Sequence, residues 1–266
     1  MMNALIRAEF LRLAATRLWL WALLAAVVLG GGMVGLMTLV GPENFDPPAP
    51  GLDTEAGVRS VLGMLSFTVF LPAALGTLAM TSEYRHRTAT YTFLHAPRRR
   101  QVLTAKLVTY GVAGLLYGLV LTGTAAIAFF GGVAARGVTP GMATGEVLGL
   151  LVRPAVAMAV YTLLGVAAGA LIRHQVAALA VVIGYLYAGE YLLMMIPGVK
   201  LLYPLLPGGA TASLTGFSYV TDTMAAELAT GPVPLLSPVG GGLLLAGYAL
   251  VAACVAVLVP MRRDVH

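Results

Sequence analysis

The stretch LWLWALLAAVVLGGGMVGLMTLV, residues 18–40, contains no charged side chain. An α-helix rises about 1.5 Å per residue, and the hydrocarbon core of a bilayer is about 30 Å thick. This stretch is therefore long enough to cross a membrane as one helix. It is also longer than the apolar core of a signal peptide, so we interpret it as an anchor and not as a cleaved leader.

Similar apolar runs recur along the whole chain. Of its 266 residues, 59% are hydrophobic and only 10% are charged, whereas a soluble domain has about 25% charged residues. No polar stretch is long enough to form a large water-facing domain. We predict a single all-α domain over residues 1–266 that spans the membrane six times. The predicted spans are 18–40, 61–80, 107–133, 147–172, 176–196 and 239–259.

The distribution of basic residues predicts the orientation of these spans. Six spans place both termini on one side of the membrane, and the segments on that side contain 12 of the 16 Lys and Arg residues. The segments on the other side contain three. Because cytoplasmic loops are enriched in Lys and Arg, we predict that both termini are cytoplasmic. This rule also accounts for the net charge of +5 without any binding of nucleic acid.

Two segments outside the spans have apolar pieces of their own. In residues 3–17, Ile6, Phe10 and Leu13 recur at helical spacing, which predicts an amphipathic helix in the membrane interface. Residues 197–236 are rich in Pro, Gly and Thr and contain apolar pieces too short to span. We predict that this extracellular segment is re-entrant or lies on the surface.

The segment TSEYRHRTATYTFLHAPRRR, residues 81–100, contains five of the basic residues and opens the predicted cytoplasmic loop 81–106. One interpretation is a set of charges that stop translocation and bind anionic lipid head groups. In the other, Thr88 and Tyr91 lie on one face of a short helix that ends before Pro97 and binds a partner protein. The residue pattern alone leaves both interpretations open.

The order of these features resembles the permease subunits of the ABC-2 family of ATP-driven transporters. The resemblance rests on residues 3–17 as an elbow helix, on a re-entrant segment within 197–236, and on the acid, Thr, Pro, Arg and Lys of the first cytoplasmic loop. These loop residues are Glu83, Arg85, Thr88, Pro97, Arg98 and Lys106. The resemblance implies that the loop contains a coupling helix, which binds in a groove of a separate ATP-binding subunit. The implied coupling residues are Glu83, Arg85, Arg87, Thr88, Tyr91, Pro97, Arg98, Arg99 and Arg100.

Motifs for several kinds of catalysis are missing from the sequence. The two lysines, Lys106 and Lys200, follow Ala105 and Val199, so neither belongs to the Gly-Lys-Ser/Thr of a phosphate-binding loop. No His lies in an HExxH motif, and no Ser lies in G-x-S-x-G. We therefore expect no catalytic residues, no metal site and no cofactor, with any ATP bound by the partner subunit.

Arg153 and Glu190 are the charged residues well inside the predicted spans. Each lies six residues from the outer end of its span, at a depth of about 9 Å. Equal depth on consecutive helices allows an ion pair between them, which would lower the cost of burying both charges. Alternatively, Glu190 lines a substrate path together with Tyr187 and Tyr191.

Glycines spaced G-x-x-x-G, which allow two helices to approach closely, occur at 31–35, 114–118 and 165–169. We predict that they pack helices together, within the chain or at a subunit interface. Six spans are too few to enclose a wide path, so we expect a homodimer or a heterodimer with another permease.

Taken together, these features predict the membrane subunit of an exporter in a bacterial plasma membrane, in contact with its lipids. The alternatives are a transporter or assembly factor that does not use ATP, and a membrane enzyme that acts on lipid. The sequence does not select a substrate.

Overall fold

The computed structural model of the chain describes residues 2–45, 48–85, 99–172, 174–196, 199–219, 221–223 and 233–261. These residues form helices and connecting segments, and no strand occurs among them. Six helical segments are long and apolar enough to cross a membrane. This confirms the predicted all-α class with six spans, by length and composition.

Three of the six spans are single α-helices, and the other three change helix type along their length. The single helices are α7 (Arg99–Arg136), α8 (Thr144–Leu171) and α13 (Pro238–Met261). The first span joins α2 (Leu18–Val27), a π-helix η1 (Val28–Met33) and α3 (Val34–Val40). The second joins α4 (Glu55–Gly63), a 3-10 helix η3 (Met64–Val69) and α5 (Phe70–Arg85). The fifth joins α9 (Gln175–Gly184), a π-helix η4 (Tyr185–Gly189) and α10 (Glu190–Met194).

The shorter helices lie outside these spans. They are α1 (Met2–Ala15), η2 (Pro42–Asn44), η5 (Val199–Leu205) and α11 (Pro207–Thr215). Helix α11 lies within the predicted re-entrant segment and packs against α13 and α8, with most of its residues buried. Its burial places this part of the segment inside the helical bundle.

Two spans begin six or more residues earlier in the structure than predicted. The second starts at Glu55 and not at residue 61, because the Thr54 hydroxyl accepts a hydrogen bond of 3.1 Å from the Gly57 N–H and caps α4. The third starts at Arg99 and not at residue 107. The last part of the predicted loop 81–106 is therefore helical, and Lys106 lies inside α7.

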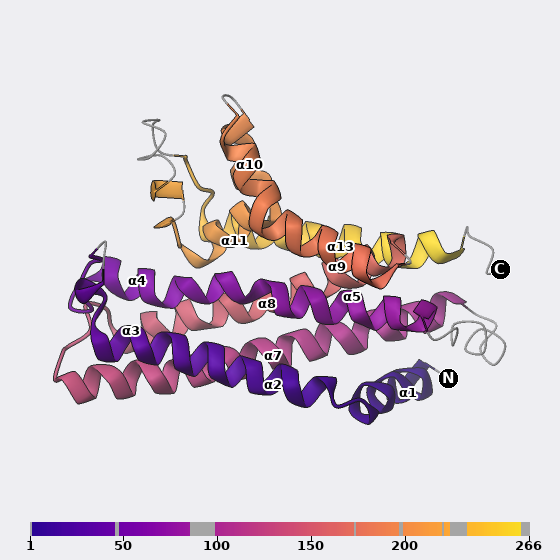
Figure 1. Cartoon of the computed structure of the whole chain (residues 1–266), viewed down its shortest axis with the longest axis horizontal. Helices are drawn as coiled ribbons and strands as arrows, with labels where there is room; N and C mark the ends of the chain where they lie inside the picture. Colours follow the sequence, from indigo (N-terminus) through magenta and orange to yellow (C-terminus); the bar gives the residue numbers. More distant parts are fainter. Residues whose placement is uncertain are drawn as a thin grey trace.

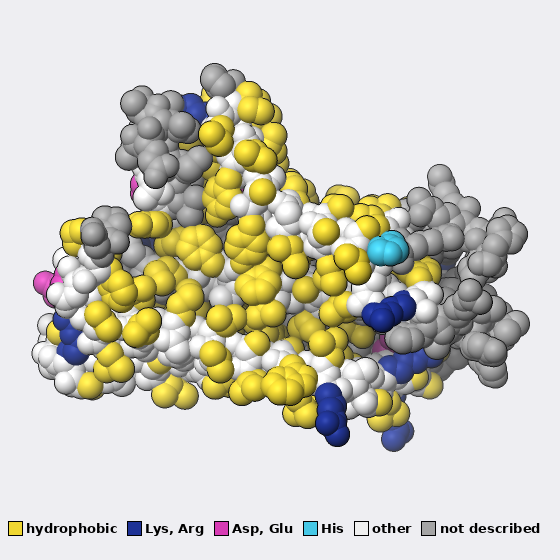
Figure 2. All heavy atoms as spheres, viewed as in Figure 1, with side chains coloured by type: hydrophobic (Ala, Val, Ile, Leu, Met, Phe, Trp, Pro, Cys, Tyr) yellow, Lys and Arg dark blue, Asp and Glu magenta, His cyan; other side chains and the backbone are white. Residues whose placement is uncertain are grey.

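Helix α8 is at the centre of the bundle, packed against α5, α7 and α13 (Figure 1). Helices α2 and α3 pack on α7, and α9 packs on α5. The start of α1, the end of α5, the start of α7 and the end of α13 lie at the same end of the bundle; we call this the terminal end. Figure 2 shows apolar side chains along the length of the bundle and Lys and Arg side chains gathered toward the terminal end.

Small residues bring α5 and α8 into close contact. A Cβ atom at Gly76 would overlap with the carbonyl oxygen of Thr162, and one at Gly165 would overlap with the carbonyl oxygen of Ala73. On α7, a Cβ atom at Gly114 would overlap with the hydroxyl oxygen of Thr162. Glycines of two predicted G-x-x-x-G pairs, 114–118 and 165–169, therefore pack helices of the same chain together.

At the end opposite the terminal end, Glu43 forms an ion pair with Arg136, which ties the segment after α3 to the end of α7. Hydrogen bonds to its own backbone N–H and to Arg136 lower the pKa of Glu43 below its usual value of 4.5. The charged carboxylate therefore stabilises the fold above about pH 4.5, and this contribution is lost as the pH falls through the lowered pKa.

We expect Glu43→Gln to lower the melting temperature of the purified protein by about 1–3 °C at pH 7, since the pair is partly exposed. At pH 3, which lies below the usual pKa of 4.5, the variant and the original protein should melt at closer temperatures, because part of the contribution of the charged carboxylate is then lost. Thermal unfolding in detergent at the two pH values measures this difference. An equal difference at both pH values would contradict the role assigned to the carboxylate.

Candidate functional site

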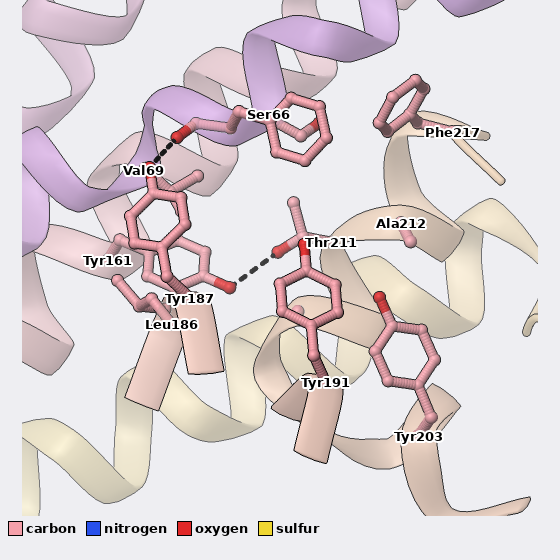
Figure 3. Close-up of a pocket in the computed structure, with 12 residues that line it drawn as sticks. Ser66, Val69, Tyr161, Leu186, Tyr187, Tyr191, Tyr203, Thr211, Ala212 and Phe217 are labelled. Atoms are coloured by element: carbon pink, nitrogen blue, oxygen red, sulfur yellow. Dashed lines mark hydrogen bonds between the residues drawn. The ribbon is translucent and has the colours of Figure 1, made fainter. Parts of the chain in front are cut away.

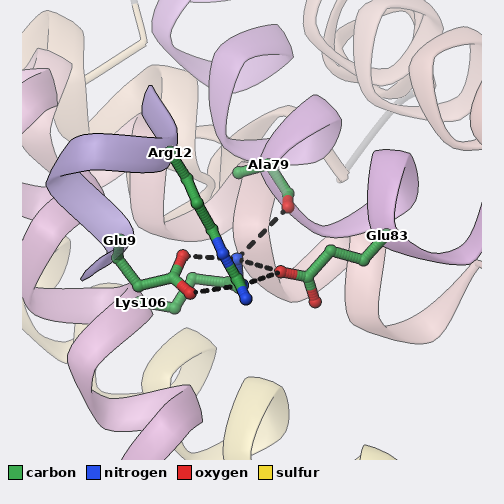
Figure 4. A network of polar contacts seen from close by, with 5 residues as sticks. All are labelled: Glu9, Arg12, Ala79, Glu83 and Lys106. Atoms are coloured by element: carbon green, nitrogen blue, oxygen red, sulfur yellow. Dashed lines mark hydrogen bonds and ion pairs between the residues drawn. The ribbon is translucent and has the colours of Figure 1, made fainter. Parts of the chain in front are cut away.

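A cluster of four charged side chains lies at the terminal end of the bundle (Figure 4). The Lys106 ammonium is 2.8 Å from Glu9 Oε2 and 2.8 Å from Glu83 Oε1. A guanidinium nitrogen of Arg12 is 2.9 Å from Glu9 Oε1 and 3.3 Å from Glu83 Oε1. The cluster thus joins α1, α5 and α7, three helices that are far apart in the sequence.

The buried position of Lys106 depends on these partners. Its side chain is only 2% exposed, and an isolated ammonium there would lose its hydration without compensation. Two carboxylates balance the two cations, so the cluster carries no formal net charge. The ring of Tyr110, one turn further along α7, lies 5.5 Å from the ammonium and adds a cation–π contact.

Of the predicted coupling residues, Glu83 belongs to this cluster, and Arg85 donates a hydrogen bond of 3.3 Å to Gln175 at the start of α9. Arg99 and Arg100 form the first turn of α7. Arg87, Thr88, Tyr91, Pro97 and Arg98 lie outside the described residues. The described part of the predicted coupling segment therefore consists of the two helix ends from which it departs.

The second group of predicted residues lies around α11. Glu190 Oε1 accepts a hydrogen bond of 2.9 Å from the Gly208 N–H in the first turn of α11. Arg153 donates one of 3.4 Å to the carbonyl oxygen of Leu214 in the last turn of α11. The structure does not bring Arg153 and Glu190 together as an ion pair, because each binds the backbone of α11 instead. The ion pair, one of the two interpretations of these residues, is therefore not formed in the structure.

A cavity lies beside Glu190, between η3, α8, the fifth span and α11 (Figure 3). Its wall contains the predicted residues Tyr187 and Tyr191, and the Tyr187 hydroxyl donates a hydrogen bond of 2.5 Å to the carbonyl oxygen of Phe67. The Thr211 hydroxyl lies 3.1 Å from the Tyr161 hydroxyl across the wall. The lining residues are Ser66, Phe67, Val69, Tyr161, Leu186, Tyr187, Tyr191, Tyr203, Gly208, Thr211, Ala212 and Phe217.

Sequence reasoning did not identify several residues of the charge cluster and of the cavity near Glu190. Glu9 and Arg12 each had a signal, since each is a charged residue close to an apolar run. Their contact with Lys106, which the sequence analysis placed in the loop, depends on the packing of α1 against α7. Tyr161 and Tyr203 stand among apolar residues and had no distinguishing signal. Within the described part of the chain, no group of three or more His, Cys, Asp or Glu residues is placed to hold a metal ion.

Comparison with protein families agrees with this architecture. The profile described as ABC-2 family transporter protein matches residues 5–189, which cover most of α1, the first four spans and most of the fifth. The chain belongs to the ABC-2 transporter family. It is therefore a multi-pass membrane protein and a permease subunit of an ABC transporter, a kind of subunit that is in general non-catalytic and works with an ATP-binding subunit. A search of curated proteins finds no match to this ABC-2 permease.

Proposed function

We propose that this ABC-2 permease is the membrane subunit of an exporter in a bacterial plasma membrane, driven by ATP that a separate subunit binds and hydrolyses. The family membership supports a partner of this kind. The two lysines lie outside any phosphate-binding loop, which fits a chain that does not hydrolyse ATP by that route. The chain itself then needs no cofactor.

The observation that carries this proposal is the buried cluster of Glu9, Arg12, Glu83 and Lys106. It ties the elbow helix to the end of α5 and the start of α7, the two helices between which the predicted coupling residues lie. A partner that presses on this segment would move α1, α5 and α7 together, because separating them would expose or unpair buried charges. The cluster is thus suited to pass a movement at the cytoplasmic face into the bundle.

The packing of α5 determines where such a movement would spread in the bundle. Helix α5 makes its closest contacts with α8, where Gly76 and Gly165 leave no space between the backbones. A shift of α5 would therefore carry α8 with it, and α8 forms part of the cavity wall beside α11. Two copies, or one copy with a related permease, would then enclose the path, with basic residues at the terminal end contacting lipid head groups.

Binding of the ATP-binding subunit provides the test. We expect a tagged chain to co-purify with an ATP-binding subunit encoded by the same cell, and the combined change of Arg98, Arg99 and Arg100 to Ser to reduce its recovery about tenfold or more. The reason is that the implied docking segment would lose three adjacent positive charges. Quantitative immunoblotting and ATPase activity of the eluted complex measure the effect.

The matched control is the change of Arg262 and Arg263 to Ser, which removes positive charge from the predicted cytoplasmic tail and should leave recovery unchanged. Transport that follows an ion gradient and persists after the ATP-binding subunit is deleted would contradict the proposal and favour an ATP-independent transporter. Lipid turnover by the purified chain alone would favour the membrane enzyme.

A further inference from the structure

Glu190 is a buried carboxylate whose hydrogen bonding is only half satisfied. The residue is 3% exposed, and its Oε1 atom accepts the bond from Gly208. The positive end of the α11 dipole faces the carboxylate there and favours its charged form. The Oε2 atom is buried and makes no hydrogen bond of its own, while the Tyr185 hydroxyl and the Gly209 N–H lie close to the carboxylate and stabilise its charge. A buried anion with free acceptor capacity is costly unless a cation or a donor reaches it.

No side chain of the described residues supplies that cation. The ion pairs of the described residues join other acids, and none of them includes Glu190. Arg153, which lies on the neighbouring span, is directed to the Leu214 carbonyl at the other end of α11. The negative charge at Glu190 is therefore stabilised by neutral donors and by the helix dipole, and by no cationic side chain of the described residues.

The free oxygen lies next to the cavity described above. Gly208 forms part of the cavity wall, and a Cβ atom at this position would overlap with Glu190 Oε2. Glu190 is not itself a lining residue, but its carboxylate contacts Gly208 and its neighbour Tyr191 forms part of the wall. Three lining residues, Tyr161, Tyr191 and Tyr203, lie within electrostatic reach of Glu190.

The rest of the wall is aromatic. Figure 3 shows the rings of Tyr161, Tyr187, Tyr191, Tyr203 and Phe217 arranged around one space, and they come from four different segments of the chain. The faces of aromatic rings carry partial negative charge and attract cations within about 6 Å. A ring-lined cavity near a buried carboxylate that has no cationic partner is a combination that favours a positively charged ligand.

We propose that this cavity binds an organic cation through its ammonium head group, with Glu190 as the counter-ion and the tyrosine rings as the cage. In the proposed function, on which this assignment of a role rests, the cavity is the site at which the permease holds its substrate. The substrate class is then an organic ammonium compound. Binding itself needs neither ATP nor the partner subunit.

Two features favour an organic ammonium group over a metal ion. Two hydroxyls of the wall are engaged with backbone carbonyls: Thr211 donates to Pro207 at 2.9 Å, and Tyr187 donates to Phe67. Alkali and alkaline-earth ions need several oxygen ligands together, whereas aromatic rings make up much of this wall. The cavity volume of about 60 Å³ admits a head group of a few heavy atoms, with the remainder of a larger molecule outside.

The test uses the purified full chain in lipid nanodiscs, without the ATP-binding subunit, and radiolabelled choline as the probe. We expect saturable binding that tetramethylammonium displaces, whereas 3,3-dimethylbutan-1-ol, a neutral molecule of the same shape as choline, and K⁺ do not. Glu190→Gln keeps the acceptor for Gly208 but removes the charge, and should weaken binding about tenfold or more. Glu146→Gln, which neutralises an acid in the first turn of α8 outside the cavity wall, is the matched control and should bind normally.

A second pair of variants tests the rings independently of Glu190. Tyr191→Phe keeps the aromatic face and should retain most of the affinity, whereas Tyr191→Leu should lose about three- to tenfold. Size-exclusion profiles and melting temperatures establish that each variant is folded. Equal displacement by the neutral alcohol, or equal binding by Tyr191→Phe and Tyr191→Leu, would overturn the inference.

Failure of this inference is distinguishable from failure of the proposed function. Co-purification and ATPase coupling in a chain that binds no choline would refute the cation site and leave the exporter assignment standing. Choline binding by a chain that works without an ATP-binding subunit would support the cation site and refute the exporter assignment.

Discussion

Replacing Lys106 with Met is expected to destabilise the protein by about 3 kcal/mol, because it leaves the buried carboxylate of Glu9 and the partly buried carboxylate of Glu83 without their shared cation. Methionine has nearly the same length as the lysine stem, so the loss reflects the charge and not a cavity. Arg12 remains beside both acids but is about half exposed and replaces only part of the lost interaction. The measurement is the melting temperature and the folded yield in detergent.

Two controls belong to this experiment. Lys200→Met changes the second lysine of the chain, which lies outside the cluster, and should leave the melting temperature close to that of the original protein. The triple variant Glu9→Gln, Glu83→Gln and Lys106→Met should be more stable than Lys106→Met alone, since it removes the unpaired charges together. Equal stability of Lys106→Met and Lys200→Met would show that the cluster does not hold α1, α5 and α7 together.

Gly76→Ala should cause a comparable loss, about 2–3 kcal/mol or more, for a steric reason. The added methyl group would overlap with the backbone carbonyl of Thr162, and a backbone atom cannot rotate away as a side chain can. Helices α5 and α8 must then separate along their closest contact. Size-exclusion chromatography and thermal unfolding would report the resulting loss of the folded form.

Gly123→Ala is the matched control, because Gly123 also lies in a long helix but has no atom within 4 Å of the position of the added methyl group. Alanine favours the helical backbone by about 1 kcal/mol over glycine, so this variant should be neutral or slightly more stable. If the two alanine variants behaved alike, the contact between α5 and α8 would be looser than the structure indicates.

The spans were predictable from the sequence because a sufficiently long run of apolar residues is stable as a helix in the hydrocarbon core of the membrane. Their ends were less predictable. Glu55, Arg59 and Lys106 are charged and were placed outside the spans, yet Arg59 pairs with Glu55 at 2.7 Å and Lys106 pairs with two acids. From the sequence, a charged residue was taken to mark the end of a span. In the structure, such a residue lies inside the helix, because a partner on the same or another helix compensates its charge.

The surroundings of Glu190 show a different limit. Equal depth of Arg153 and Glu190 was a sound argument for two helices in direct contact, but α11 lies against both residues and offers backbone groups to each. Backbone N–H and C=O groups occur in almost every residue, so no sequence pattern announces that they replace an ion pair. The π-helices η1 and η4 were equally hidden, since they differ from α-helix only in which carbonyl each N–H selects.

The charge cluster at the terminal end also constrains how the protein is made. Lys106 follows Glu9 by 97 residues, so at about 5–20 residues per second the ribosome needs roughly 5–20 s to supply the missing cation. During this interval Glu9 in the newly made helix α1 has Arg12 as a counter-charge but lacks Lys106. Helix α1 therefore cannot yet pack in its final position. Helix α1 must therefore remain at the bilayer surface until the third span has been inserted. The N-terminal helix is then one of the last parts of the first half of the chain to pack.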